Sequence, residues 1–261
     1  MPQTPLHIIA LACAACGTAA ARADINYSGG FATHDDLVTN GQAAFVLSGS
    51  NTVARLADNG AKEANSLFSS TKQDVSAFVA HFIFQITGDV VGDGFTFCIQ
   101  NNAPTAVGAN GGDLGYTGIL HSVAFKFDIY GNYPGDPGTS SVGLFINGAS
   151  PLGGIDPAPS GIDLYSKHIF DVTLASSGTT LDATITDLTS ASHLSLTKSY
   201  SLNIPSTIGS NSAYVGFTAG TGNARATMDV QSFTFTSVPE PTSLTLLALA
   251  LPCLLRRRSR R

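Results

Sequence analysis

Short segments of aromatic and β-branched residues recur along nearly the whole middle of the chain, and their pattern is that of β-strands. Each segment has fewer than ten residues, as in FVAHFIFQI at 78–86. Clusters of Gly, Asn, Asp and Ser separate the segments, and convincing helical periodicity is absent. This pattern predicts an all-β fold, an antiparallel β-sandwich or barrel. The predicted strands cover residues 78–86, 94–99, 122–129, 142–147, 168–174, 181–188, 213–219 and 229–237.

The first 23 residues have the pattern of an export signal. A short apolar run is followed by small residues and closes with Ala21-Arg22-Ala23, an A-x-A cleavage site, although the usual positive charge at the start is missing. Cys13 or Cys16 could instead mark a lipoprotein signal, but neither follows a convincing apolar-small tripeptide. We therefore expect residues 1–23 to be removed on secretion.

The last 24 residues, 238–261, consist of Val-Pro-Glu-Pro, an apolar stretch at 244–255 and five arginines within the last six positions. The apolar stretch is shorter than the roughly 20 residues that span a bilayer comfortably. This ordered triple resembles the PEP-CTERM sorting signal of Gram-negative bacteria. The resemblance implies transient membrane contact, recognition by an exosortase and delivery to the cell surface. A weak C-terminal membrane anchor is the alternative.

Between these two ends, residues 24–237 are long enough for one domain with a sizeable core. Seven of the 13 Lys and Arg residues lie in this range, against 17 of the 18 Asp and Glu residues, so the domain has a formal charge of −10. Such a surface argues against nucleic acid as a partner and suits cations or neutral ligands. Cys98 is the domain's single cysteine, so no internal disulfide is expected.

One segment, AFKFDIYGNYPGDPGTSSVGL at 124–144, combines a predicted strand with a loop rich in oxygen ligands. Asp128 and Asp136 are eight residues apart with Asn132 midway, and Gly and Pro residues allow the backbone to curve. Calcium takes six to eight oxygen ligands, which carboxylates, an amide oxygen and carbonyls supply. An ordinary turn between two strands is the alternative, because Gly-Asp-Pro-Gly is itself a turn sequence.

The order of the segments resembles that of the L-type (legume-type) lectins over essentially the whole domain. The similarity rests on LVTNGQAAFV and ANSLFSSTKQDVSAFVAHFIFQI near the start, then VGDGFTFCIQN, NGGDLGY, FKFDIYGNYPGDP and the closing AYVGFTAGTGNARATMDVQSFTFTS. The resemblance implies a concanavalin-like jelly roll whose loops bind a monosaccharide with the help of calcium. It also implies a protein that is not an enzyme.

The resemblance assigns roles to individual residues. Calcium would be held by Asp128, Asn132, Asp136 and the backbone carbonyl of Tyr130. Asp93 matches the aspartate that accepts hydrogen bonds from sugar hydroxyls and that follows a cis peptide bond in the family. The implied carbohydrate-binding residues are Asp93, Gly111, Gly112, Asn132, Asn223 and Ala224, and Tyr133 is the nearest candidate by sequence for an aromatic platform.

Lys126 departs from the family pattern. Plant members hold a second, transition-metal ion with a Glu and a His, and the matching positions here are Lys126 and Ser141. Lys126 and Asp128 share one face of the predicted strand, because side chains alternate with period two. A charged lysine has three donors and no acceptor, so it could hold Asp128 and Asp136 without a metal. We therefore expect one calcium ion, no second metal and Lys126 as a substitute cation, unless Lys126 merely points to solvent.

Two alternative functions remain open. A glycoside hydrolase needs a pair of carboxylates, yet Glu63 is the domain's single Glu, and no strand carries an E-x-D pair. A structural matrix protein with a degenerate sugar site would fit the missing second-metal ligands. Retention of Asp93, Asp128, Asn132 and Asp136 together argues against that reading. The favoured interpretation is a secreted, surface-sorted, calcium-dependent lectin whose sugar the sequence does not identify.

Overall fold

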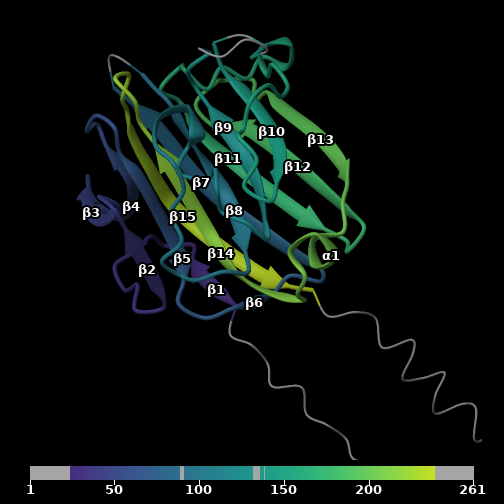
Figure 1. Cartoon of the computed structure of the whole chain (residues 1–261). Coiled ribbons are helices and arrows are strands. Elements are labelled where there is room, and N and C mark those ends of the chain that lie inside the picture. The colour runs from purple at the N-terminus through teal and green to yellow at the C-terminus, as the bar shows by residue number, and fades with distance from the viewer. Residues whose placement is uncertain (1–23, 89–90, 132–135, 138, 239–261) are drawn as a thin grey trace, which may run out of the picture.

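The chain folds into two antiparallel β-sheets that pack face to face (Figure 1). The structure, a computed structural model, describes residues 24–88, 91–131, 136–137 and 139–238. Each of the eight strands predicted from the sequence is present, with ends shifted by no more than a few residues. The prediction of an all-β sandwich is therefore confirmed.

The first sheet contains the strands at both ends of the described chain. The short strand β1 (Ile25–Tyr27) pairs with β15 (Thr227–Ser237) and is a side branch of this sheet. In spatial order its strands are β13 (Ser195–Ser201), β12 (Thr180–Asp187), β11 (Ile169–Ser176), β7 (Phe78–Thr87), β15 (Thr227–Ser237), β4 (Asn51–Asp58) and β3 (Ala44–Ser48), with β1 (Ile25–Tyr27) beside β15.

The second sheet carries the segments to which the sequence assigned the binding residues. The short strand β6 (Gln73–Asp74) pairs with β14 (Ser212–Gly220) and is a side branch of this sheet. In spatial order its strands are β10 (Ser141–Ile146), β9 (Ser122–Asp128), β8 (Gly94–Gln100), β14 (Ser212–Gly220), β5 (Ala64–Ser69) and β2 (Leu37–Asn40).

Helical structure is confined to short pieces in the described part of the chain. The α-helix α1 (Ile204–Ile208) has Asn203 as its N-cap, whose side chain accepts a hydrogen bond of 2.8 Å from the Ser206 N–H. The 3₁₀ turns are η1 (Gly111–Asp113) and η2 (Ala158–Ser160). Five residues are too few to produce a helical period, so the sequence did not indicate α1. None of the described helices is long and apolar enough to cross a membrane.

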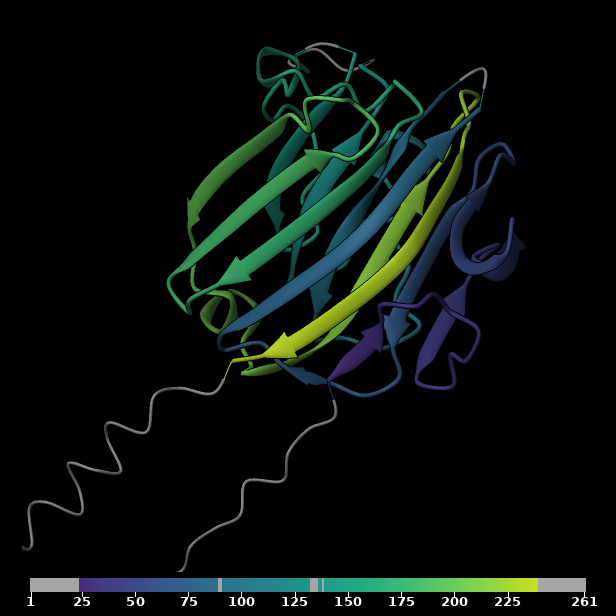
Figure 2. The same cartoon turned by 180° about the vertical axis from the view of Figure 1, so that it is seen from behind.

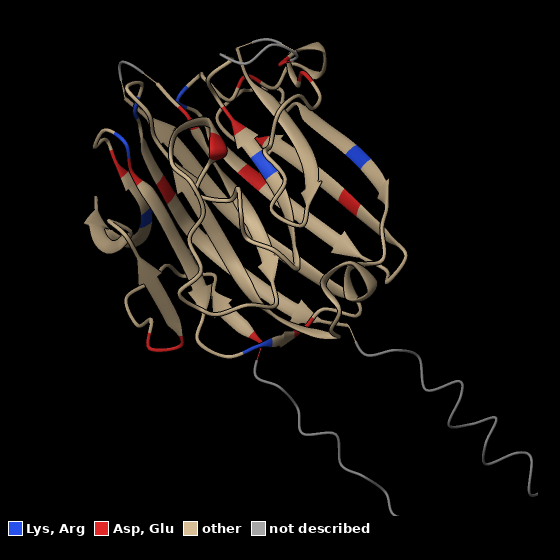
Figure 3. Cartoon of the chain, in the orientation of Figure 1, with Lys and Arg blue, Asp and Glu red and all other residues tan. Residues whose placement is uncertain are grey.

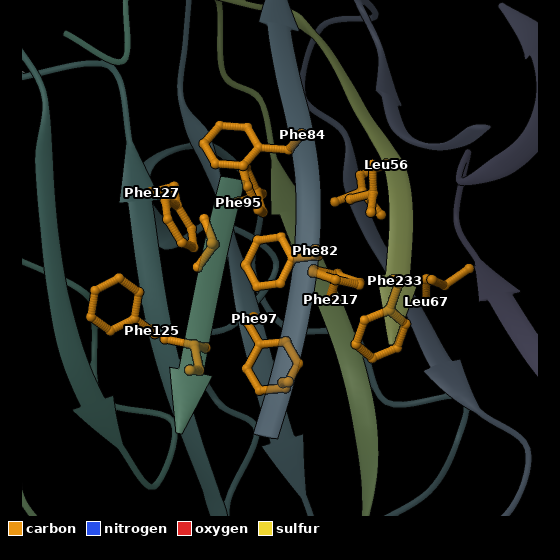
Figure 4. Packing of buried hydrophobic residues seen from close by; sticks show 14 of the residues in the cluster. Leu56, Leu67, Phe82, Phe84, Phe95, Phe97, Phe125, Phe127, Phe217 and Phe233 are labelled. Carbon is orange, nitrogen blue, oxygen red and sulfur yellow. The ribbon is translucent and has the colours of Figure 1, made fainter. Parts of the chain in front are cut away.

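Phenylalanine rings fill the space between the sheets (Figure 4). Phe82 on β7 is fully buried, and its ring lies 5.1 Å from that of Phe217 on β14, 5.7 Å from that of Phe127 on β9 and 5.8 Å from that of Phe97 on β8. One side chain of the first sheet thus contacts three strands of the second. Cys98 is buried in this second sheet and is free. Burial of these rings is the main source of stability, since each apolar side chain of this size contributes about 1.5–3 kcal/mol.

The two ends of the described chain lie side by side (Figure 2). β1 pairs with the C-terminal half of β15, with Ile25 opposite Phe235. The Ser237 N–H also donates to the Asp24 carboxylate at 3.4 Å. The loop that precedes β15 therefore lies at the opposite end of the sandwich from both described ends.

Acidic residues outnumber basic ones over the described chain (Figure 3). Arg55 on β4 and Asp229 on β15 form an ion pair across neighbouring strands, with Nε and Oδ1 at 2.8 Å. Among the described basic residues, Lys126 is the only one that is fully buried. This buried lysine lies near the C-terminal end of β9.

Candidate carbohydrate-binding site

Asp93 and Asp128 lie on neighbouring strands at one end of the second sheet. β8 and β9 are antiparallel with Gly94 opposite Asp128, so the start of one strand meets the end of the other. The Ile129 N–H donates to the Asp93 carbonyl at 2.9 Å and extends this pairing by one step. The strand register therefore brings together two carboxylates that are far apart in the sequence.

Two glycine-containing loops close over the same place. The Gly111 N–H donates to the Thr221 carbonyl at 3.0 Å, which joins η1 to the loop between β14 and β15. Gly111 has φ +65°, a left-handed conformation that glycine adopts without strain. The N–H of Gly111 is thus engaged between the two loops, and Gly112 remains the predicted source of a ligand-facing amide from η1.

Asp93 is the centre of this arrangement. Its side chain is buried, and its Oδ2 atom has no hydrogen-bond partner among the described residues. The peptide bond between Gly92 and Asp93 is cis. A Cβ atom at position 222 would lie 3.0 Å from Oδ2, so Gly222 is what allows the loop to approach the carboxylate this closely.

The electrostatic state of Asp93 follows from this enclosure. Burial raises the pKa of its carboxyl to about 6, the Gly222 N–H opposes the rise, and the Asp128 charge adds to it. A buried carboxylate oxygen without a partner is costly. A water molecule or a ligand hydroxyl would satisfy it.

The loop after Gly222 presents backbone donors beside Asp93. Asn223 is exposed and Ala224 is buried, and neither N–H has a partner among the described residues. The Gly222 N–H donates to the Ala224 carbonyl at 3.0 Å and fixes the loop as a tight turn. A Cβ at position 92 would lie 2.6 Å from the Ala224 Cβ, so this loop and the Asp93 segment are in direct contact.

Asp128, the last residue of β9, is buried and has several partners. Its Oδ1 accepts the Tyr130 N–H at 2.9 Å, while Oδ2 lies 3.2 Å from Lys126 Nζ and 3.4 Å from Ser141 Oγ. Burial raises the pKa of the Asp128 carboxyl, and the Lys126 ammonium and the Tyr130 N–H oppose this rise without cancelling it. A further cation beside this carboxylate would favour its charged form.

Asp136 joins the same group from the loop beyond β9. Its Oδ1 lies 3.5 Å from Lys126 Nζ and accepts the Gly153 N–H at 2.9 Å. Asn132, predicted to bind both calcium and sugar, and Tyr133, the predicted aromatic platform, lie outside the described residues. The structure therefore brings Asp93, Asp128, Asp136 and Lys126 to one end of the sheet.

The ligand types of this cluster are those of a hard cation. Two carboxylates and the Tyr130 carbonyl offer oxygen atoms, which suit calcium. Within the described part of the chain no three His, Cys, Asp or Glu side chains come together as a metal-binding group. Calcium therefore fits only with ligands beyond the two carboxylates, and the nitrogen and sulfur ligands typical of a transition-metal site are missing from the described cluster.

The sequence profile of the legume lectin domain matches residues 31–249. The chain belongs to the legume lectin domain family. Solved lectins share its fold, and three of them show the extent of the similarity. The seed lectin of Lotus tetragonolobus has a TM-score of 0.69 and 21% identity, with 84% of this chain and 100% of that chain covered. Lectin I from Ulex europaeus, in complex with the methyl glycoside of α-L-fucose, has a TM-score of 0.68 and 18% identity, with 83% and 98% covered. The Bauhinia forficata lectin in complex with GalNAc has a TM-score of 0.66 and 21% identity, with 83% and 99% covered.

In this legume lectin domain the Tyr130 side chain lies beside the Asp93 segment, a position that the sequence did not suggest. Only its backbone carbonyl was expected to contribute, as a calcium ligand. Its side chain is 40% exposed, and Cγ would lie 3.3 Å from a Cβ at position 92, directly beside the Asp93 segment. The sequence feature that could have predicted this position is the separation of two residues between Asp128 and Tyr130, because alternate residues of an extended chain share a face.

A second group of carboxylates in the lectin domain bears on the hydrolase alternative. Glu63 is buried, and burial raises its pKa, as does a hydrogen bond with Asp58. The Asp58 N–H also donates to Glu63 Oε2 at 3.4 Å, so Asp58 is a direct neighbour of Glu63, whereas the two carboxyl groups of a glycosidase are held about 5–9.5 Å apart around the substrate. Glu63 Oε2 also accepts the Asn65 side-chain N–H at 2.8 Å. Glu63 is therefore held by neighbouring groups of the protein.

Proposed function

We propose that the protein binds carbohydrate at the end of the second sheet where Asp93, the Gly111–Gly112 turn, the Asn223–Ala224 loop and the Asp128–Asp136 loop meet. The observation that carries the proposal is the buried Asp93 carboxylate, whose Oδ2 has no partner among the described residues although two glycine loops approach it closely. Related lectins with the same fold bind α-L-fucose glycoside and GalNAc, which makes a sugar the natural ligand class.

Each group at this end matches part of a monosaccharide. The Asp93 carboxylate accepts hydrogen bonds from sugar hydroxyls, and bonds of this charge-assisted kind are shorter and stronger than neutral ones. The N–H groups of Asn223 and Ala224, which have no partner among the described residues, donate to sugar oxygens together with the Gly112 N–H. The exposed Tyr130 ring offers an apolar face to the C–H side of the pyranose.

Calcium would bind between Asp128 and Asp136, together with the Tyr130 carbonyl and Asn132. The bound ion would supply positive charge beside two buried carboxylates and fix the loop that carries Tyr130. Lys126 contributes a permanent positive charge to the same pair of carboxylates. We propose one calcium site.

The two chain ends suggest where the lectin works. Residues 1–23 would direct export, and residues 238–261 would be handled by an exosortase after transient contact with the membrane. The protein would then act at the cell surface of a Gram-negative bacterium or in the medium. An extracellular polysaccharide or a foreign glycan is the corresponding ligand.

Calcium should raise the melting temperature of the purified protein. An ion that binds only the folded state stabilises it by about 2.7 kcal/mol at one hundred times its dissociation constant, which corresponds to an upward shift of several degrees. The measurement is a thermal melt in millimolar calcium and again in chelator.

Two matched variants locate the calcium response. Asp136→Asn should abolish the shift between calcium and chelator, while Asp163→Asn, at an exposed loop position, should keep it. A wild-type protein that melts at the same temperature in both conditions would contradict the calcium proposal.

Carbohydrate binding should weaken in acid because the ionised form of Asp93 is the better acceptor. Its pKa of about 6 in the metal-free protein is lowered by any bound cation, so the affinity should fall at or below about pH 6. Calorimetric titration of the calcium-loaded protein with its best glycan, over a series of pH values, tests this. An affinity that stays constant down to about pH 4, the ordinary Asp pKa, would exclude Asp93 as the acceptor.

A structural protein of the extracellular matrix is the competing function. It is favoured by the ion pairs of Lys126 with Asp128 and Asp136, because these contacts hold both carboxylates in place without a metal ion. Screening the calcium-loaded protein against immobilised glycans, with galactose, fucose and GalNAc glycosides included, separates the two. Binding that is competed by free sugar supports the lectin, and the absence of any bound glycan supports the structural role.

A further inference from the structure

Lys126 is a fully buried ammonium surrounded by oxygen atoms. Its Nζ lies 2.7 Å from the Pro151 carbonyl, 3.2 Å from Asp128 Oδ2 and 3.5 Å from Asp136 Oδ1. Burial of a charge is costly unless the charge is paired and hydrogen-bonded. The lysine has three N–H donors, and the structure offers them three oxygen acceptors. The alternative, that Lys126 points to solvent, is therefore excluded.

Through these contacts Lys126 joins three segments of the chain. Asp128 belongs to β9, Asp136 to the loop that follows, and Pro151 to a connection that begins after β10. The third segment is bound twice, because the Gly153 N–H also donates to Asp136. These contacts hold the carboxylates of the predicted calcium loop in one place.

The surrounding residues are shaped to the lysine stem. A Cβ atom at Gly154 would lie 3.2 Å from Lys126 Cε and 2.6 Å from the Val142 carbonyl, so glycine lets the chain pass closely over it. The Phe145 ring centroid lies 5.4 Å from Nζ, within the range of a cation–π contact. Packing on several sides indicates a built position for the ammonium.

The same position is unsuited to a second metal ion. Lys126 and Ser141 stand where the plant lectins have a carboxylate and an imidazole, and a charged lysine has no lone pair to bind a metal. Asp128, Asp136 and Lys126 together carry a charge of −1, which one calcium ion changes to +1. A further divalent ion would bring the buried group to +3 and would face the ammonium directly.

We propose that Lys126 is a positioning residue that replaces a transition-metal ion, so that this lectin domain assembles its binding loop with an internal cation and takes up no second metal. The role of Lys126 in holding Asp128, Asp136 and Pro151 is independent of sugar binding. Only the single calcium ion in this picture rests on the proposed function.

Metal content of the wild-type protein is the first test. The protein is dialysed against calcium together with manganese, passed through a desalting column and analysed by elemental mass spectrometry. We expect calcium at no more than one equivalent and manganese well below one. One equivalent each of calcium and manganese would overturn the proposal.

Variants then test whether the Lys126 ammonium stabilises the two buried carboxylates. Lys126→Met should lower the melting temperature by about 10 °C, because it leaves two buried carboxylates without their cation. Lys198→Met, a half-buried strand lysine without an ion pair in the described part of the chain, should shift it by no more than about 2 °C. An equal response of the two variants would contradict the positioning role.

The double variant Lys126→Glu with Ser141→His gives a readout that a merely structural lysine would not produce. Carboxylate and imidazole beside Asp128 and Asp136 form a transition-metal site. The melting temperature of the double variant should rise with added manganese or zinc. That of the wild type should not respond to these ions beyond the effect of calcium. If the double variant melts identically with and without these ions, Lys126 does not occupy a metal position.

These outcomes are separable from failure of the proposed function. A wild-type protein that binds no glycan but shows the lysine-dependent stability and the engineered metal response refutes the lectin while it supports Lys126. A protein that binds glycan only with two metals per chain supports the lectin and refutes Lys126.

Discussion

We expect Asp93→Ala to abolish carbohydrate binding and to leave the fold intact. Charge-assisted hydrogen bonds contribute about 1.5–3 kcal/mol each, so the loss of those that Asp93 makes to sugar hydroxyls should reduce affinity by about 100-fold or more. Titration calorimetry or binding to a glycan surface, with wild type and variant side by side, measures this change.

The same substitution should raise the stability of the metal-free, sugar-free protein. Because the folded-state pKa of Asp93 is raised to about 6, the favourable contribution of its protonated form is complete below about pH 4 and is lost as the pH rises through 6. At neutral pH the ionised, buried carboxylate therefore destabilises the fold. We expect removal of this group to increase the free energy of unfolding by about 1 kcal/mol.

Asp182→Ala is the matched control for both effects. Asp182 lies exposed on β12 of the first sheet, and its removal should change neither sugar affinity nor stability by a measurable amount. A protein in which Asp93→Ala lowers stability by more than about 1 kcal/mol, with glycan binding retained, would make Asp93 a structural residue.

Phe82→Ala should cost about 3–5 kcal/mol of folding stability, the usual range for a buried phenylalanine. Its ring contacts those of Phe97, Phe127 and Phe217, which belong to three strands of the opposite sheet. Truncation therefore leaves a cavity at the centre of the interface between the sheets. Urea denaturation followed by fluorescence or circular dichroism gives the free energy of unfolding.

Leu47→Ala provides the comparison for Phe82→Ala. Leu47 lies on β3 and is 74% exposed, so its loss should change stability by no more than about 0.5 kcal/mol. A cost below about 1 kcal/mol for Phe82→Ala would mean that the sheets do not pack through this ring.

The strands that the sequence predicted are those whose inward side chains are large and apolar. β7 alternates buried and less buried residues along its whole length, which is the pattern that FVAHFIFQI displays. β13 (SLTKSYS) was missed because it is an edge strand in which Leu196 is the single buried residue. At an edge, pairing with a neighbour decides the structure, and the local sequence carries little signal.

The binding end was predictable where the spacing of residues is short. The contact between Lys126 and Asp128 follows from their separation of two on one strand. The contact between Lys126 and Pro151 could not be predicted in this way. Pro151 lies 25 residues further along the chain, and only the tertiary fold brings it to the lysine. The Tyr130 side chain was likewise missed, because its position beside Gly92 depends on how β8 and β9 meet.

The pairing of β1 with β15 determines how the molecule can be held. Both described ends emerge together, and β15 runs its 11 residues from the Asn223–Ala224 loop to those ends. At about 3.3 Å per residue this strand separates the two by about 35 Å. A tether at either terminus would therefore act as a stalk on the far side of the domain. It would present the Asn223–Ala224 loop outward, away from the surface that carries the protein.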